Sequence, residues 1–157
     1  MSDNYEDLDN ANTLARYCKR SQVLPDGRPA HDNFRPRVKD GVLEDHLSTD
    51  CLEMLGSSTR EVQLELLRTN CTLKRKPRDM FALLNVGDTK EVVRRDSSDH
   101  RVLGFKHVPR PGQDSHCGIF GVGIGIDEEL IQKIIAEEVF LMVSATPVIK
   151  SPLSSSP

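Results

Sequence analysis

Aromatic residues are scarce in this chain of 157 residues: they make up 4% of it, and tryptophan is missing. Hydrophobic residues still account for 37% and charged residues for 29%, as in an ordinary globular domain. A chain of this length suits one domain that buries most of its apolar surface. The core therefore has to be built mainly from leucine, isoleucine and valine.

Long apolar runs and closely spaced cysteines are missing too. No apolar stretch approaches the roughly 18 residues of a membrane-spanning helix, and the N-terminus has no apolar signal region. The four cysteines, Cys18, Cys51, Cys71 and Cys117, are far apart, which excludes the C-x-x-C pattern of zinc and redox sites. We expect reduced thiols in a cytoplasmic protein without membrane contact.

A strong net charge of either sign is also missing. The net charge is −3 and the pI is about 5.9, so composition gives no general case for nucleic acid as a partner. The charges are nevertheless unevenly distributed. Residues 1–12 are acidic and residues 147–157 are of low complexity, so we expect disordered tails on both sides of a single domain over residues 13–146.

Residues 74–78 carry four positive charges in five positions. Cations at the end of a helix suit the helix dipole, which favours a solvated helix end. The alternative is a nucleic-acid-binding module that contacts phosphates through this stretch. The stretch has no interleaved aromatic residues for base stacking, which makes the second interpretation the weaker one.

Two stretches have the pattern of a main helix. Ser58 and Glu61 fit a capping box at the start of a helix over residues 59–72. Asp127 is placed to cap a second helix, whose apolar residues recur with helical spacing up to Val139. A brief helix is expected between these two, over residues 89–95.

Short apolar runs over residues 80–86, 102–108 and 116–122 predict strands, and residues 34–38 are extended. The strands over 102–108 and 116–122 are expected to pair as an antiparallel hairpin. The predicted fold class is α+β: a small sheet of three or four short, mainly antiparallel strands, with the two main helices packed on one face.

Several short motifs occur in a fixed order. They are D-G-R-P at residues 26–29, Phe34, L-S-T-D at residues 47–50, the run 81–87, H-V-P-R-P at residues 107–111 and S-H-C-G-I at residues 115–119. This arrangement resembles a group of small, uncharacterised bacterial proteins over roughly residues 14 to 140. The resemblance implies a bacterial, cytosolic protein and brings no known fold or activity with it. That group has valine where Thr49 stands and alanine or serine near Cys117.

His107, Ser115 and His116 are the candidate catalytic residues. His107 ends one predicted strand and His116 begins the next, so a hairpin would bring the two imidazoles to one end of the sheet. Imidazoles titrate near neutral pH and serve as general acid and base. Asp50 or Asp114 is placed to orient one of them, as is Glu53. The alternative is that both histidines only fix the loop between the strands.

Other chemistry is disfavoured by spacing. A metal site of His107, His116 and Cys117, completed by His46 or Asp50, conflicts with the opposite directions of adjacent strand residues. The same divergence disfavours Ser115 or Cys117 as a nucleophile activated by His116. The glycines at positions 121, 123 and 125 match no phosphate-binding motif. We therefore expect no cofactor and no metal.

The sequence as a whole favours a non-catalytic interaction or accessory protein. Its small size and the lack of a complete catalytic constellation support this hypothesis, with another protein, encoded nearby, as the expected partner. The first alternative is a small hydrolase or nuclease-like enzyme that uses His107 and His116. The second is the nucleic-acid-binding module through residues 74–78, which would require these cations to join Arg35, Arg37 and Arg110 in one patch.

Overall fold

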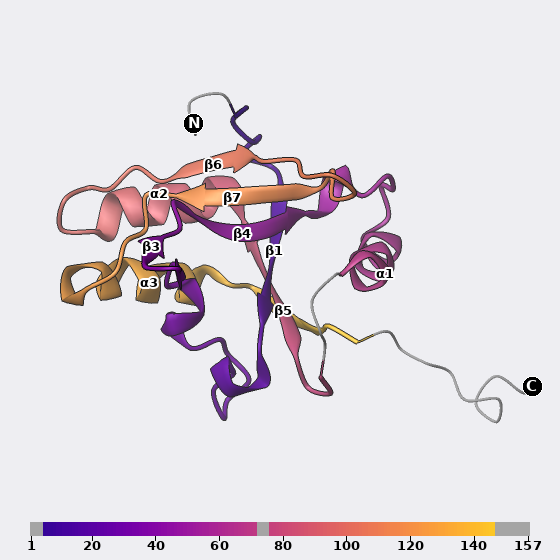
Figure 1. Ribbon diagram of the computed structural model, residues 1–157, viewed down its shortest axis with the longest axis horizontal. Coiled ribbons are helices and arrows are strands. Elements are labelled where there is room, and N and C mark those ends of the chain that lie inside the picture. The colour runs from indigo at the N-terminus through magenta and orange to yellow at the C-terminus, as the bar shows by residue number, and fades with distance from the viewer. Residues whose placement is uncertain (1–4, 72–75, 147–157) are drawn as a thin grey trace, which may run out of the picture.

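The computed structural model describes residues 5–71 and 76–146, and its main feature is a six-stranded antiparallel sheet with the strand order β6-β7-β4-β1-β5-β8 (Figure 1). The strands are β1 (Thr13–Cys18), β4 (His46–Cys51), β5 (Met80–Asn85), β6 (Gly104–His107), β7 (His116–Phe120) and β8 (Leu141–Ser144). Strands β2 (Val38–Lys39) and β3 (Val42–Leu43) form a separate small sheet. The helices are α1 (Arg60–Asn70), α2 (Val86–Asp96) and α3 (Ile126–Glu138).

The α+β class and the antiparallel hairpin of β6 and β7 are confirmed, but the predicted number of strands is too small. Three strands of this sheet were missed by the sequence pattern: β8 lies at an edge, and β1 and β4 lie side by side in the middle. In β1 both faces are covered, so Leu14 and Ala15 are both buried and no polar alternation marks the strand. Arg16 further breaks its apolar run.

The two main helices lie on opposite faces of the sheet, so the prediction that they share one face is wrong. Adjacent strand residues point to opposite faces, and they separate two hydrophobic clusters in β1. Leu14 belongs to the cluster that contains Ile131 and Ile135 of α3, whereas Ala15 belongs to the cluster that contains Leu67 of α1. Helix α2 joins α3 on its face through Val93, which belongs to the larger cluster.

The N-terminal segment extends the sheet beyond β6, so the predicted disordered tail over residues 1–12 is wrong for residues 5–12. The backbone N–H of Leu8 donates to the carbonyl of Phe105, and that of His107 donates to the carbonyl of Glu6. The Leu8 side chain is buried in the larger cluster. Residues 1–4 lie outside the described residues, and so do residues 147–157, for which a disordered tail was also predicted.

Helix α3 begins at a glycine and not at the predicted Asp127 cap. Gly125 is the N-cap and has a φ of 112°, a left-handed conformation that favours glycine. Asp127 instead lies in the first turn, with Glu128 and Glu129. Negative side chains there interact favourably with the positive end of the helix dipole.

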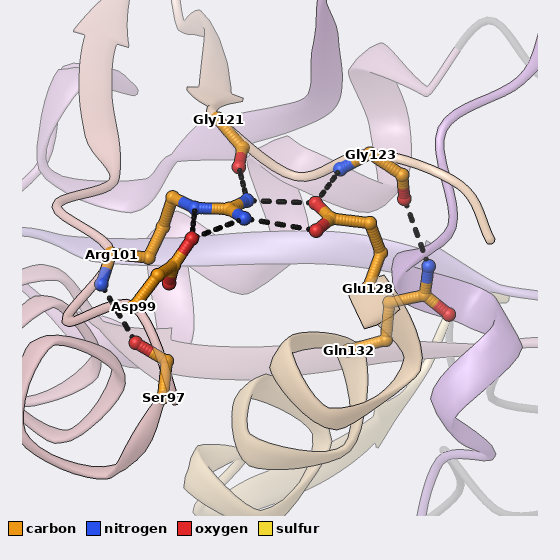
Figure 2. A network of polar contacts seen from close by, with 7 residues as sticks. All are labelled: Ser97, Asp99, Arg101, Gly121, Gly123, Glu128 and Gln132. Carbon is orange, nitrogen blue, oxygen red and sulfur yellow. Dashed lines mark hydrogen bonds and ion pairs between the residues drawn. The ribbon is translucent and has the colours of Figure 1, made fainter. Parts of the chain in front are cut away.

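A network of polar contacts connects the start of α3 to two loops (Figure 2). The Arg101 guanidinium donates to both carboxylate oxygens of Glu128, at 2.7 and 2.9 Å, and to the carbonyl of Gly121. Asp99 accepts two further hydrogen bonds from Arg101, and Glu128 also accepts one from the Gly123 N–H. The bonds from Arg101 hold the pKa of Glu128 below its ordinary value, against the opposing effect of its burial.

The D-G-R-P turn caps the other end of α3. Gly27 occupies the turn with a φ of 88°. One terminal guanidinium nitrogen of Arg28 donates to the carbonyls of Ala136, Glu137 and Val139, at 3.1 to 3.4 Å. The last carbonyls of a helix lack the usual partner four residues on, and a cation there also suits the helix dipole; the carbonyl of Ala136 accepts in addition from the Val139 N–H. This motif therefore has a structural role.

Helix α1 packs against β1 and β5 through Leu67, Ala15 and Phe81, and in Figure 1 it lies at the opposite end of the sheet from α2 and α3. On the same side of the sheet, β4 and β7 are bordered by other segments and not by α1. No helix among the described residues is long and apolar enough to cross a membrane.

Candidate functional site

A pocket of about 670 Å³ lies over β4 and β7 on the face of the sheet away from α2 and α3. In β4 the residues Leu47 and Cys51 point into the core of α2 and α3, so the alternate residues line the pocket. On the pocket face β4 places His46, Ser48 and Asp50, and β7 adds His116, while Leu47 and Thr49 of β4 also border the pocket. The volume is in the range typical of small-molecule sites.

His46 and His116 are neighbours in this pocket. Their ring centroids are 5.8 Å apart and their planes meet at 74°. Nδ1 of His46 donates to the carboxylate of Asp45 at 2.7 Å, and Nδ1 of His116 donates to the carbonyl of Val108 at 2.7 Å. Both partners are acceptors, so they fix the tautomer in which neutral imidazole has its lone pair on Nε2.

The Nε2 atoms of both histidines are buried and have no hydrogen-bond partner. A polar atom that is withdrawn from water without a partner costs about 1–3 kcal/mol, and such groups occur where function requires them. Among the described residues, the other buried polar side-chain atoms without a partner belong to Asn33 and Thr49. Thr49 is paired with Cys117 of the larger cluster, so its hydroxyl lies on the opposite face of the sheet from the two histidines.

The position of the His46 ring depends on Gly118 of β7. Gly118 is paired with Ser48, so the space for its side chain lies on the pocket side of the sheet. A Cβ atom built there would lie 2.6 Å from Cδ2 of His46 and 2.8 Å from Cγ. The imidazole thus occupies the volume that any other residue at position 118 would need, and it contacts Phe120 at a centroid distance of 5.0 Å.

Burial shifts the pKa of His116 and the pKa of the neighbouring Asp50 in opposite directions. The pKa of His116 is lowered, mainly because burial disfavours the imidazolium, with Arg110 and His46 as further causes. The pKa of the Asp50 carboxyl is raised by burial, although a hydrogen bond from Ser115 opposes this effect. His116 is therefore neutral at neutral pH and available as a proton acceptor.

The structure separates His107 from His116, so the predicted convergence of these two imidazoles is wrong. Position 107 is paired with Cys117, whereas His116 is the adjacent residue and points to the other face. Nε2 of His107 donates to the carbonyl of Asp114 at 2.6 Å, which fixes the loop between β6 and β7. The residue that joins His116 is His46, which comes from a strand about 70 positions earlier in the chain.

Ser115 borders the same pocket, as its place beside His116 suggested. Its hydroxyl donates to Oδ1 of Asp50 at 3.0 Å. Asp50 is therefore the partner of Ser115, and the Nε2 atoms of the two histidines are not. The arrangement orients the serine but does not give it a histidine base.

Cationic side chains surround the pocket. Arg16 is half-buried, and its guanidinium donates to the carbonyls of Asn33 and Ser48 at 3.0 and 2.8 Å. Burial is the main reason why the pKa of Arg16 falls to about 10, so it stays charged at neutral pH. Arg35, Arg37 and Arg110 are exposed along the pocket, and none of the three forms an ion pair with a carboxylate of the described residues.

The cysteines do not supply a nucleophile to the pocket. Cys18, Cys51 and Cys117 are buried free thiols, and Cys71 is partly exposed. Burial raises the pKa of Cys18 to about 12, and contact with Cys51, together with burial, raises the pKa of Cys117. In the described part of the chain, no three His, Cys, Asp or Glu side chains are grouped so that they could hold a metal ion.

Comparison with protein-family models, with curated proteins and with solved structures gives no match for this chain. The evidence for function is therefore the geometry of the pocket. One sequence signal could have identified His46 and Asp50 as pocket residues. Polar and buried residues alternate over positions 46–51, as in a half-buried strand.

Proposed function

We propose that the protein is an acid–base enzyme of the hydrolase or nuclease type, with His46 and His116 as its catalytic pair. One observation carries this proposal: two neighbouring imidazoles are anchored through Nδ1, and the Nε2 atoms of both are buried without a partner. General acid–base catalysis requires proton-transfer groups with a fixed direction. The anchors supply that direction here.

The two histidines receive different roles. His116 is the general base, because burial favours its neutral form and its lone pair lies on Nε2. His46 is the general acid, because its ring is held through Nδ1 by the Asp45 carboxylate and lies next to the ring of the base. Asp50 and Ser115 are neighbouring polar groups that position the substrate.

This proposal replaces the accessory role that the sequence favoured. That hypothesis depended on the lack of a complete catalytic constellation, and the pair of His46 and His116 removes this reason. The proposal retains the alternative of a hydrolase or nuclease-like enzyme, with His46 in the place of His107.

The test is a kinetic comparison on three chromogenic substrates: p-nitrophenyl acetate, p-nitrophenyl phosphate and bis-p-nitrophenyl phosphate. As a hydrolase the protein should turn over at least one of them, and as a nuclease it should cleave an oligonucleotide. His46→Ala and His116→Ala should each lower kcat by at least about 100-fold, which is typical for the loss of a general acid or base. His100→Ala is the matched control, because His100 lies exposed in the loop after α2 and should leave the rate unchanged.

Two results would contradict the proposal. One is that neither the three chromogenic substrates nor an RNA or DNA oligonucleotide is cleaved above the uncatalysed rate. The other is a rate that persists in His116→Ala while the variant keeps the melting temperature of the parent protein. Loss of the rate in both His107→Ala and His116→Ala, with His46→Ala fully active, would instead support the pair predicted from the sequence.

A further inference from the structure

We infer that the substrate of this site is single-stranded RNA, cleaved by its own 2′-hydroxyl, and that Arg35, Arg37 and Arg110 hold the phosphates beside the cleaved bond. The inference rests on the proposed acid–base pair. It adds a substrate class and a set of binding residues to it.

The first support is the source of the cations. Arg35 and Arg37 come from the segment that leads into β2, and Arg110 comes from the loop between β6 and β7. These segments are distant in the chain but border the same pocket as the two histidines. Guanidinium groups bind phosphate oxygens through two parallel hydrogen bonds, and these three have no competing ion pair within residues 5–71 and 76–146.

The surroundings of the histidines also suit an anion. Arg16 carries its charge at the edge of the pocket without a carboxylate partner among the described residues, because its hydrogen bonds go to backbone carbonyls. Asp50, the carboxyl closest to His116 in the β-ladder, has a raised pKa because it is buried. The pocket is bordered by six cationic side chains and by four carboxylates, which are Asp32, Glu44, Asp50 and Asp114, so acidic groups offset only part of the positive charge.

The second support is the chemistry that two imidazoles can perform on RNA. Nε2 of His116 accepts the proton of the 2′-hydroxyl, and the 2′-oxygen forms a bond to the adjacent phosphorus. The bond from phosphorus to the 5′-oxygen breaks, and that oxygen takes a proton from Nε2 of protonated His46. The products are a 2′,3′-cyclic phosphate and a 5′-hydroxyl. The nucleophile belongs to the substrate, so the pocket needs to supply only a base, an acid and cations.

The third support is an aromatic ring at the pocket. Tyr17 is partly exposed there and packs edge to face on the buried Phe81, with ring centroids 5.6 Å apart. The hydroxyl of Tyr17 donates to Asp79, which fixes the ring of a partly exposed residue. Aromatic rings are the usual stacking partners of unpaired bases.

The basic stretch over residues 74–78 does not contribute to this site. Its described cations, Lys76 and Arg78, are not among the residues that border the pocket.

The test uses three end-labelled oligonucleotide pools of equal length, with randomised positions around one central nucleotide. One pool is entirely DNA, one has a single central ribonucleotide, and one has the same nucleotide with a 2′-O-methyl group. Only the pool with the free 2′-hydroxyl should be cut, directly after the ribonucleotide, leaving a 2′,3′-cyclic phosphate. His46→Ala and His116→Ala should each slow this cleavage by at least about 100-fold.

The arginines are tested with the double variant Arg35→Gln/Arg37→Gln. It should raise KM for the ribonucleotide pool and leave kcat nearly unchanged, because the lost contacts act on binding. Loss of two phosphate contacts should also reduce the slope of log KM against log salt concentration by about 1.4, at about 0.7 for each single-strand contact. Arg94→Gln/Arg95→Gln is the matched control, since both residues lie exposed on α2, on the other face of the sheet.

The outcomes show whether the acid–base pair, the RNA substrate or the role of the arginines fails. Hydrolysis of a chromogenic ester that depends on both histidines, without cleavage of the ribonucleotide pool, would refute RNA as the substrate and keep the acid–base pair. Equal cleavage of the all-DNA pool would refute attack by the 2′-hydroxyl. No turnover of any probe by a folded protein would refute both proposals. An unchanged KM in the Arg35/Arg37 variant would refute the role of these arginines.

Discussion

Gly118 is the residue on which the position of the His46 ring depends. We expect Gly118→Ala to move the imidazole, because the added Cβ would lie 2.6 Å from it. The backbone of β7 cannot easily yield, since β7 is paired with β4 on one side and with β6 on the other. Overpacking of this kind costs about 1–3 kcal/mol in stability. In an NMR titration the His46 ring signals should shift, and any hydrolytic activity should fall.

The control for Gly118→Ala lies on the neighbouring strand. Gly104 of β6 has room for a Cβ, with its nearest neighbours at 3.4 Å, so Gly104→Ala should leave the His46 signals in place. If Gly118→Ala leaves them unchanged as well, the contact between Gly118 and His46 does not fix the ring.

At the scale of single residues, His116 and Ser115 could be chosen from the sequence but their partner could not. His107 was attractive because it is near His116 in the chain, and the hairpin that joins their strands was predicted correctly. Alternation then sends His107 and His116 to opposite faces. The true neighbour, His46, arrives through the pairing of β4 with β7, a contact between distant segments that no local pattern reveals.

The N-terminal segment protects an edge of the sheet. Without residues 5–8, strand β6 would present unpaired backbone groups to solvent, which invites pairing with other chains. Leu8 anchors the segment, and its side chain is only 6% exposed. Its sequence looked like a solvated tail because four acidic residues surround one buried leucine, and a single apolar residue gives no periodic signal.

Leu8→Ala should therefore lower the free energy of unfolding by about 2–5 kcal/mol, the range for removing a buried leucine side chain. Urea denaturation followed by circular dichroism would measure the loss. Glu6→Ala is the control, because the Glu6 side chain is exposed and its carbonyl bond to His107 does not depend on it. Equal stabilities of the two variants would mean that Leu8 does not anchor the segment.

The whole molecule has two unlike faces. Helices α2 and α3 seal one face of the sheet with the larger cluster, whereas α1 covers only part of the other face and leaves the pocket. The predicted helices at 59–72 and near 127–139 both exist, but helix patterns do not reveal which face of a sheet each helix covers. This arrangement places stability and the candidate chemistry on opposite sides.

The network of Arg101 and Glu128 contributes to the stability of the sealed side, and this contribution depends on pH. The pKa of Glu128 in the folded protein is below its ordinary value of 4.5. Its contribution is therefore complete above about pH 4.5 and is lost as the pH falls through the lower folded value. We expect Glu128→Gln to lose on the order of 2 kcal/mol at pH 7, because the partly buried Arg101 keeps its charge without a carboxylate.

Chemical denaturation at several pH values between 7 and 3 would measure this effect. The stability gap between the parent protein and Glu128→Gln should be constant from pH 7 to about 5 and should narrow in more acidic solution. Glu91→Gln is the control, because the pair of Glu91 and Arg94 is exposed on both sides and should contribute less than about 1 kcal/mol. A gap that stays constant down to pH 3 would show that the charge of Glu128 does not stabilise the start of α3.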